Sequence, residues 1–221
     1  MNRENNVTSR DQNRALWLST FAFTVCFAIW TIFSIIGIQI KKDLGLSDTQ
    51  FGLLAATPIL TGSLIRLFLG IWTEQYGGRI VFSLVMLAAS VATWMLTTAS
   101  TYPQFLLAAL EKQGTALGVF GAGNIGAALT KLLAPMIMVA YGWHTVAQVW
   151  AVGLAVTAVL FFVFSKDDPG LARRRVEGVK AVPFAVQMEP LKNLQVWRFG
   201  LYYFFVFGAF VALALWLPRY L

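Results

Sequence analysis

The chain has 221 residues, of which 58% are hydrophobic and only 12% are charged, and its mean hydropathy is +0.68. Soluble domains carry about a quarter charged residues, so this composition excludes an ordinary soluble protein and indicates one whose solvent is largely the bilayer. In a soluble protein the net charge of +7 would indicate nucleic-acid binding. Here the basic residues lie between apolar runs, where they orient the chain and meet anionic lipid, so no nucleic-acid partner is predicted.

The chain starts with a polar tail, residues 1–14, without a cleavable signal peptide, because the apolar run that follows is too long for one. Six apolar runs then reach the roughly 20 residues that cross the hydrocarbon core as a helix. Lipid offers backbone polar groups no partners, so an all-α polytopic membrane protein is predicted. The single cysteine, Cys26, is expected to pack within the first run. The six runs are residues 15–40, 51–72, 80–99, 115–141, 145–165 and 197–217.

The gaps between these runs are short and polar. Ser47 and Asp48 are a plausible N-cap for the second helix. Residues 102–110 form a seventh apolar stretch, but a helix of that length reaches only about 13 Å and cannot span the bilayer. The longest gap, residues 166–194, is basic and is expected to be a cytoplasmic linker between two bundles.

The order of the runs conflicts with the charge rule for topology. Arginines 3, 10 and 14 place the tail in the cytoplasm, and the linker is expected there too, so an even number of spans must separate them. Only five full-length runs lie between the tail and the linker. The simplest interpretation is that a fourth helix begins at residue 102 and is largely missing. A re-entrant half-helix and an inverted second half are the alternatives.

Four regions follow from this pattern. Residues 1–14 are the cytoplasmic tail, 15–165 an incomplete N-terminal transmembrane bundle and 166–194 the cytoplasmic linker. Residues 195–221 are interpreted as the first helix of a truncated second bundle, because a spanning run after a long linker has nothing further to pack against.

Two charges lie deep in the interior of the apolar runs, where charged side chains are costly and often functional. Arg66 lies in the second run and Lys131 in the fourth, and no run supplies a carboxylate partner. An anionic substrate would provide the missing negative charge, and arginine suits a planar oxyanion because it donates two parallel hydrogen bonds. Arg66 is therefore predicted to bind substrate, with snorkelling to the interface as the alternative. For Lys131, snorkelling or a structural contact is favoured.

A glycine-rich segment, residues 114–126, lies in the same run as Lys131. Its glycines recur at spacings of three and four, so they line one helical face and allow another helix to approach closely. Asn124 lies within the pattern. Its amide needs a partner in hydrocarbon and can donate to an anion. The segment is not a nucleotide-binding loop, since no strand precedes it.

A tight turn containing Gly70, Glu74, Gly77, Gly78 and Arg79 joins the second and third runs. The glycines permit a sharp reversal, and the two charges are able to contact helix ends. Such a turn is predicted to be a conformational latch.

Enzyme chemistry is not predicted. The only histidine, His144, lies beside Trp143 in a short turn, with no acid–base partner or metal-ligand cluster around it. No catalytic residue, metal or cofactor is therefore expected.

These motifs resemble the major facilitator superfamily. The turn is similar to its loop signature, glycine-x-x-x-aspartate-x-x-glycine-x-arginine, with Glu74 in the place of the aspartate and Gln75 in that of a usual basic residue. Within the superfamily the chain resembles the nitrate/nitrite porters. The resemblance rests on Arg66, eleven residues before Gly77, on the aromatic residues 202–208, and on the glycine motif with its asparagine: Gly118, Gly121, Gly123, Asn124 and Gly126.

The resemblance implies a partial major-facilitator fold with six full spans and a short stub, in the inner (plasma) membrane with a cytoplasmic N-terminus. It implies alternating-access transport of nitrate or nitrite, with Arg66, Asn124, Gly123 and Gly121 binding the anion and Tyr203 or Phe207 stacking on it. The family has twelve spans and a second binding arginine, so activity is expected to require the missing C-terminal half. A transporter of another small or organic anion and a non-transporting membrane fragment are the alternatives.

Overall fold

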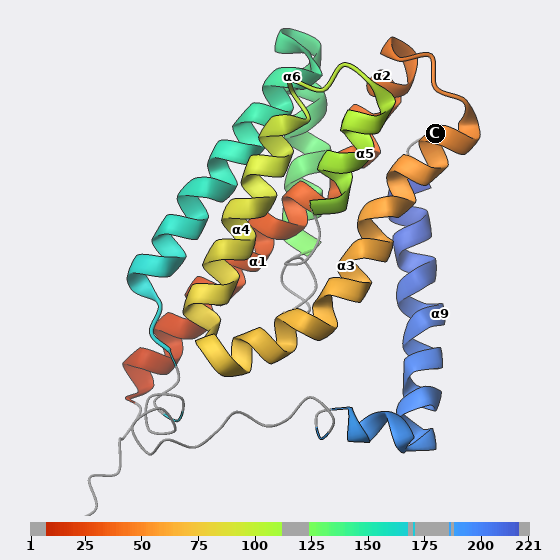
Figure 1. The fold of residues 1–221 in the computed structure, drawn as a ribbon. Helices are drawn as coiled ribbons and strands as arrows, with labels where there is room; N and C mark the ends of the chain where they lie inside the picture. Colours follow the sequence, from red (N-terminus) through yellow and green to blue (C-terminus); the bar gives the residue numbers. More distant parts are fainter. Residues whose placement is uncertain (1–7, 112–123, 168–169, 171–185, 187, 217–221) are drawn as a thin grey trace, which may run out of the picture.

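In a computed structural model, residues 8–111, 124–167, 170, 186 and 188–216 are described, and these contain helices and no strand. Figure 1 shows long helices packed side by side as a bundle, with the last helix, α9, at its edge. The all-α prediction is confirmed for this part of the chain. The helices are α1 (Ser9–Thr31), α2 (Phe33–Asp43), α3 (Asp48–Tyr76), α4 (Gly78–Met95), α5 (Tyr102–Glu111), α6 (Asn124–Phe164), the 3₁₀ helix η1 (Glu189–Lys192) and α9 (Leu194–Trp216).

Three stretches of the described residues are long and apolar enough to cross a membrane: Ser9–Asp43, Gly78–Met95 and Ile125–Phe164. The first combines α1 and α2, which meet at Ile32 with helical backbone. The third is α6, whose 41 residues are two helices joined at Gly142, where φ is 81°. This kink falls between the runs predicted at 115–141 and 145–165, although the start of the former lies outside the described residues.

Helix α1 begins earlier than the apolar pattern predicts. Its first residue is Ser9, because the side chain of Thr8 accepts a hydrogen bond from the Asp11 amide at 3.3 Å and caps the helix. The cap predicted at Ser47 is confirmed at α3. There Ser47 Oγ accepts from the Gln50 amide, while Gln50 Oε1 accepts from the Ser47 amide.

Hydrogen bonds identify the two ends of the bundle. At one, here called the Trp143 end, Trp143 Nε1 donates to Asp43 Oδ2 at 3.0 Å, and the Tyr102 hydroxyl donates to the Gln50 carbonyl at 3.1 Å. At the other, the Asp11 end, Lys166 Nζ lies 3.3 Å from Asp11 Oδ1. The N-terminal helix and the start of the linker therefore lie at the same end, as the topology argument requires.

The path between residues 102 and 142 explains how this is possible. Helix α5 starts at the Trp143 end, and α6 reaches that same end at its kink, so the chain returns to the end it left (Figure 1). The remaining crossings are α1 with α2, α3, α4 and the second half of α6, which restores an even number. Both a re-entrant half-helix and a fourth helix cut short after about half its length give this path.

The core at the Trp143 end depends on Trp143 itself, which is 6% exposed and packs near Phe105. Replacing Trp143 by phenylalanine removes the donor to Asp43 and part of the ring. We expect the free energy of unfolding to fall by about 2 kcal/mol. Thermal unfolding in detergent measures this, with Trp17→Phe as the control because Trp17 is 72% exposed. Equal shifts in the two variants would contradict a role for the hydrogen bond.

Candidate functional site

Helices α1 and α6 approach each other closely at Gly126. A Cβ atom added to Gly126 would lie 1.9 Å from the Thr24 carbonyl oxygen, so only glycine fits against the backbone of α1. One turn further, Thr130 Oγ1 donates to the Ala28 carbonyl at 2.9 Å and accepts from Trp150 Nε1 at 3.0 Å. The predicted packing function of the glycine motif is thereby confirmed at Gly126.

This contact places the start of α6 deep in the bundle. Thr24 lies near the middle of the stretch Ser9–Asp43, so Gly126 is about half-way between the two ends of the bundle. Asn124 begins α6 only two residues earlier, about 3 Å along the axis. Its backbone is therefore at interior depth. Its side chain and the predicted companions Gly121 and Gly123 lie outside the described residues.

Arg66 lies within helix α3. It is ten residues from the end of this helix at Tyr76, about 15 Å along the axis, so its backbone also lies well inside the bundle. The side chain of Arg66 is outside the described part of the structure. Its contact with an anion or with Asn124 remains a prediction.

The aromatic residues predicted on the last helix pack against the same level of α1. Tyr203 and Phe207 are stacked, with ring centroids 5.2 Å apart and planes 13° apart. Phe207 packs against the buried pair Phe27 and Trp30, and so does Ala127, three residues after Asn124. Helices α6 and α9 thus both pack against the last turns of α1, near the middle of the stretch Ser9–Asp43.

Phe27 and Trp30 were not predicted as part of the site. They belong to a tilted aromatic series with Phe23, and Phe27 and Trp30 have ring centroids 5.0 Å apart. The signal in the sequence is the spacing of four and then three, which puts the three rings on one helical face. In an apolar run such a face is usually simple core, so the pattern alone did not distinguish them.

Lys131 is exposed on α6, next to the fully buried Thr130. It is in none of the three ion pairs among the described residues, which join Asp11 to Arg14, Asp11 to Lys166, and Lys41 to Asp48. Its side chain therefore points away from the packed face of α1.

The turn predicted to be a latch contacts the end of helix α6 through Arg79. Gly77 has φ 91° and separates α3 from α4. Beyond it, the Arg79 amide donates to Asp167 Oδ1 at 3.0 Å and Arg79 Nε donates to the Phe162 carbonyl at 2.7 Å. The guanidinium also lies 4.5 Å from the centre of the Phe162 ring. The predicted contact with a helix end is confirmed for Arg79.

The other residues of the turn have surroundings unlike those of Arg79. Glu74 is exposed and takes part in none of the ion pairs just named. A side chain at Gly70 would meet nothing within 4 Å, whereas one at Gly78 would touch Phe82 and Thr73. A role for the five residues as a conformational latch remains a prediction.

Replacing Arg79 by lysine tests the contact with α6. Lysine keeps the charge but loses both the Nε donor and the planar group over Phe162. We expect the free energy of unfolding to fall by about 1 kcal/mol. Arg198→Lys is a matched control, because Arg198 is exposed on α9. Equal melting temperatures for the two variants would show that the Phe162 contact adds no stability.

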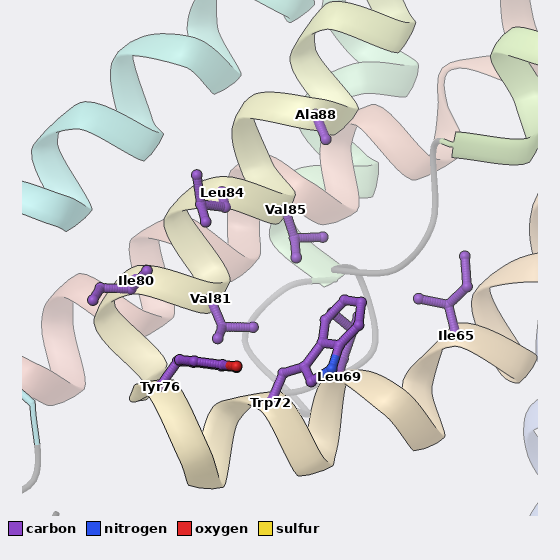
Figure 2. Close-up of a pocket in the computed structure, with 9 residues that line it drawn as sticks. All are labelled: Ile65, Leu69, Trp72, Tyr76, Ile80, Val81, Leu84, Val85 and Ala88. Atoms are coloured by element: carbon purple, nitrogen blue, oxygen red, sulfur yellow. The ribbon is translucent and has the colours of Figure 1, made fainter. Parts of the chain in front are cut away.

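One cavity of 660 Å³ opens between α3 and α4 (Figure 2). It does not coincide with the predicted anion site, because its walls are almost wholly apolar. The lining residues are Ile65, Leu69, Trp72, Tyr76, Ile80, Val81, Leu84, Val85 and Ala88.

A protein-family profile and several curated relatives match this chain. Residues 18–111 match the profile of the Major Facilitator Superfamily. The matched stretch covers less than half of the chain. It includes α3, the Gly77 turn, α4 and α5, and so covers the elements that carry Arg66 and the latch.

Similarity to curated relatives covers almost the entire chain. "Probable nitrate/nitrite antiporter NarK1" of Thermus thermophilus is 38% identical over 95% of this chain and 54% of its own length. "Nitrite extrusion protein" of Bacillus subtilis is 30% identical over 95% of this chain and 57% of its own length. "Probable nitrate/nitrite transporter NarK2" of Mycobacterium tuberculosis is 29% identical over 96% and 59%. The chain thus spans somewhat more than half the length of these relatives.

The aligned region itself is longer than the chain. It extends over 247 residues for the Thermus protein, whereas the whole chain has 221. The relative therefore carries residues inside the aligned region that have no counterpart here. The chain is thus similar, over nearly all of its length, to proteins named as transporters or as an extrusion protein.

Proposed function

We propose that this chain is part of a transporter that moves nitrate or nitrite across the membrane by alternating access. The observation that supports the proposal is that α6 and α9 both pack against the last turns of α1, near the middle of the stretch Ser9–Asp43. There Gly126 brings the start of α6 against Thr24, while Phe207 of α9 packs on Phe27. Transporters of this kind hold substrate near the bilayer midplane, between repeats. The names of the relatives agree with nitrate or nitrite as the solute.

The proposed chemistry follows from the residue types at this depth. Arg66 would donate two parallel hydrogen bonds to two oxygens of the trigonal anion and stay charged throughout. Asn124 would donate one more through its amide. Gly121 and Gly123 would leave room for the ion, and the stacked ring of Tyr203 or Phe207 would cover its flat face.

Charge balance supports an anionic substrate. The described acidic residues of the helices lie at or near helix ends, as do Asp11, Asp43 and Asp48. An arginine at interior depth thus needs its negative charge from elsewhere, and a bound anion would provide it. The same absence of interior carboxylates in the described spans favours anion exchange over proton symport, since no side chain there is available to carry the proton.

We propose the following membrane placement. The Asp11 end of the bundle faces the cytoplasm, because helix α1, which follows the basic tail, starts there, and the basic linker 166–194 begins there with Lys166. The membrane would be the plasma (inner) membrane. Residues 15–165 would form the first bundle and residues 195–221 the first helix of a second, which the whole protein needs for activity.

Solute uptake by cells without nitrate carriers of their own tests this function. The cells would express a chimera, here called the completed transporter, in which the chain is joined to those segments of the Thermus relative that have no counterpart in it. We expect uptake of nitrate and nitrite, and none of succinate or glucose. Loading the cells with nitrite should accelerate nitrate entry if exchange operates. Preferential uptake of succinate would instead support an organic-anion transporter, and no uptake of any solute would contradict a transporter built on this chain.

A further inference from the structure

Lys131 is a charged residue near the middle of the bundle. The neighbouring Thr130 donates to the Ala28 carbonyl, and Ala28 lies near the middle of the stretch Ser9–Asp43. Lys131 also precedes the kink at Gly142 by eleven residues, which is about 17 Å along α6. Half of a hydrocarbon core measures about 15 Å, so the backbone of Lys131 lies close to the depth of the bilayer midplane.

At this depth snorkelling does not account for Lys131. A lysine side chain extends about 6 Å from its Cα atom, so the ammonium group stays about 10 Å short of the Trp143 end. None of the ion pairs among the described residues includes it. A charge in this position is costly unless it faces water or an ion, and such residues commonly line the path of a transported solute.

Lys131 shares one face of α6 with Asn124. The two residues are seven positions apart, which is about two turns of the helix and about 10 Å along its axis. This face differs from the one that packs on α1, to which Gly126 and Thr130 belong. Ala128 lies between them on the shared face, is exposed and carries only a methyl group, so it leaves room for an ion beside the helix.

Arg66 lies at the level of Asn124 and further from the Trp143 end than Lys131. Asn124 is eighteen residues from the kink at Gly142, and Arg66 is eighteen residues from the start of α3 at Asp48. Both are therefore about 27 Å from the Trp143 end, against about 17 Å for Lys131. An anion that enters from this end meets the level of Lys131 before it reaches the level of Arg66.

We propose that Lys131 binds the transported oxyanion at an approach position, about 10 Å before the level of Arg66 and Asn124 on the extracytoplasmic side. The inference rests on the proposed function and adds a binding residue and a direction to it. In low-dielectric surroundings the ammonium charge attracts an anion from a distance, and salt screens it little. Lysine suits this role because its single flexible charge holds a planar anion less specifically than the arginine fork does, so the anion moves on.

The kinetics of nitrate uptake by the completed transporter test this role. In Lys131→Gln we expect the KM for external nitrate to rise about tenfold and the maximal rate to stay within a factor of about two, because a charge about 10 Å away changes attraction and not the geometry of the bound anion. Lys131→Arg should keep the parent KM. Higher ionic strength should raise the KM of the parent more than that of Lys131→Gln.

Lys192→Gln is the matched control, since Lys192 is exposed in η1 and lies outside the spans. It should leave the KM unchanged. An unchanged KM in Lys131→Gln, beside a parent that transports nitrate, would overturn the proposal and leave the proposed function intact. A fall in the maximal rate without a change in KM would show a purely structural role and would overturn it too.

A labelling experiment gives an answer even where no transport is measured. Lys131→Cys and Val149→Cys are made in the completed transporter without other cysteines, Cys26→Ala included, and reconstituted in lipid vesicles. Val149 is the matched position: it is 47% exposed and precedes Trp150, whose Nε1 donates to Thr130, so it lies near the depth of Lys131.

A negatively charged, water-soluble thiosulfonate should modify Lys131→Cys but not Val149→Cys, because a thiol that faces lipid does not ionise. Nitrate should slow the reaction at Lys131→Cys severalfold. No reaction at either position would place residue 131 against lipid and overturn the proposal. A reaction that nitrate does not slow would overturn it as well, because it would show a water-filled path without a bound anion.

Discussion

Replacing Arg66 by lysine in the completed transporter should reduce nitrate uptake about 100-fold, to the background of the assay. Lysine keeps the positive charge but presents a single ammonium group, so it cannot donate two parallel hydrogen bonds to a planar oxyanion. Loss of charge-assisted bonds of about 3 kcal/mol corresponds to a change of this size. Initial rates of nitrate uptake at matched expression measure it.

Two controls distinguish a loss of anion binding from a loss of folded protein. Arg198→Lys makes the same chemical change at an exposed position on α9 and should leave uptake unchanged. The melting temperature of the Arg66→Lys chain should stay within a few degrees of the parent. Normal nitrate uptake by the Arg66→Lys transporter would show that Arg66 snorkels to the interface and does not bind substrate.

Local structure could be predicted from the sequence where neighbouring residues alone determine it. The reversal between α3 and α4 needs a residue with positive φ, which Gly77 provides, and the kink in α6 needs Gly142 for the same reason. The cap at Ser47 is likewise a matter of a few consecutive residues. Membrane-spanning runs follow from length and polarity, because lipid leaves the backbone no alternative to a helix.

Pairings between distant segments could not be predicted. The Arg79 contact joins residues 83 positions apart, and nothing near Phe162 in the sequence marks its carbonyl as an acceptor. The depth of Asn124 depends on which residue of α1 meets Gly126, and many positions in that apolar run would have served. The number of runs was partly informative. Because an odd number of full runs separates two segments that are both expected in the cytoplasm, it indicated that the chain takes an unusual path at residues 102–110.

The site itself was predicted by residue type more than by position. A cation, an amide and an aromatic pair were expected around one anion, and the structure brings the aromatic pair and the start of α6 to the same part of α1. Phe27 and Trp30 were missed, because an aromatic face in an apolar run has no mark that separates a substrate wall from ordinary core. The side-chain geometry of Arg66 and Asn124 stays a prediction.

The α1–α6 contact should be the most sensitive to a single added methyl group. In Gly126→Ala the new Cβ would lie 1.9 Å from the Thr24 carbonyl oxygen, so the helices must separate. Separation also lengthens the hydrogen bond between Thr130 and the Ala28 carbonyl. We expect the free energy of unfolding to fall by about 3 kcal/mol, and the melting temperature by about 10 °C. Thermal unfolding in detergent measures both.

Gly153→Ala is the matched control on the other half of α6. A Cβ there would meet nothing within 4 Å, and alanine favours the helix more than glycine does, so this chain should melt at or slightly above the parent temperature. Because Asn124 lies two residues from Gly126, separation of the helices should also displace the proposed anion site. Gly126→Ala should therefore lower nitrate uptake in the completed transporter, whereas Gly153→Ala should not. Similar melting temperatures for the two variants would mean that α1 and α6 do not approach each other this closely in the membrane.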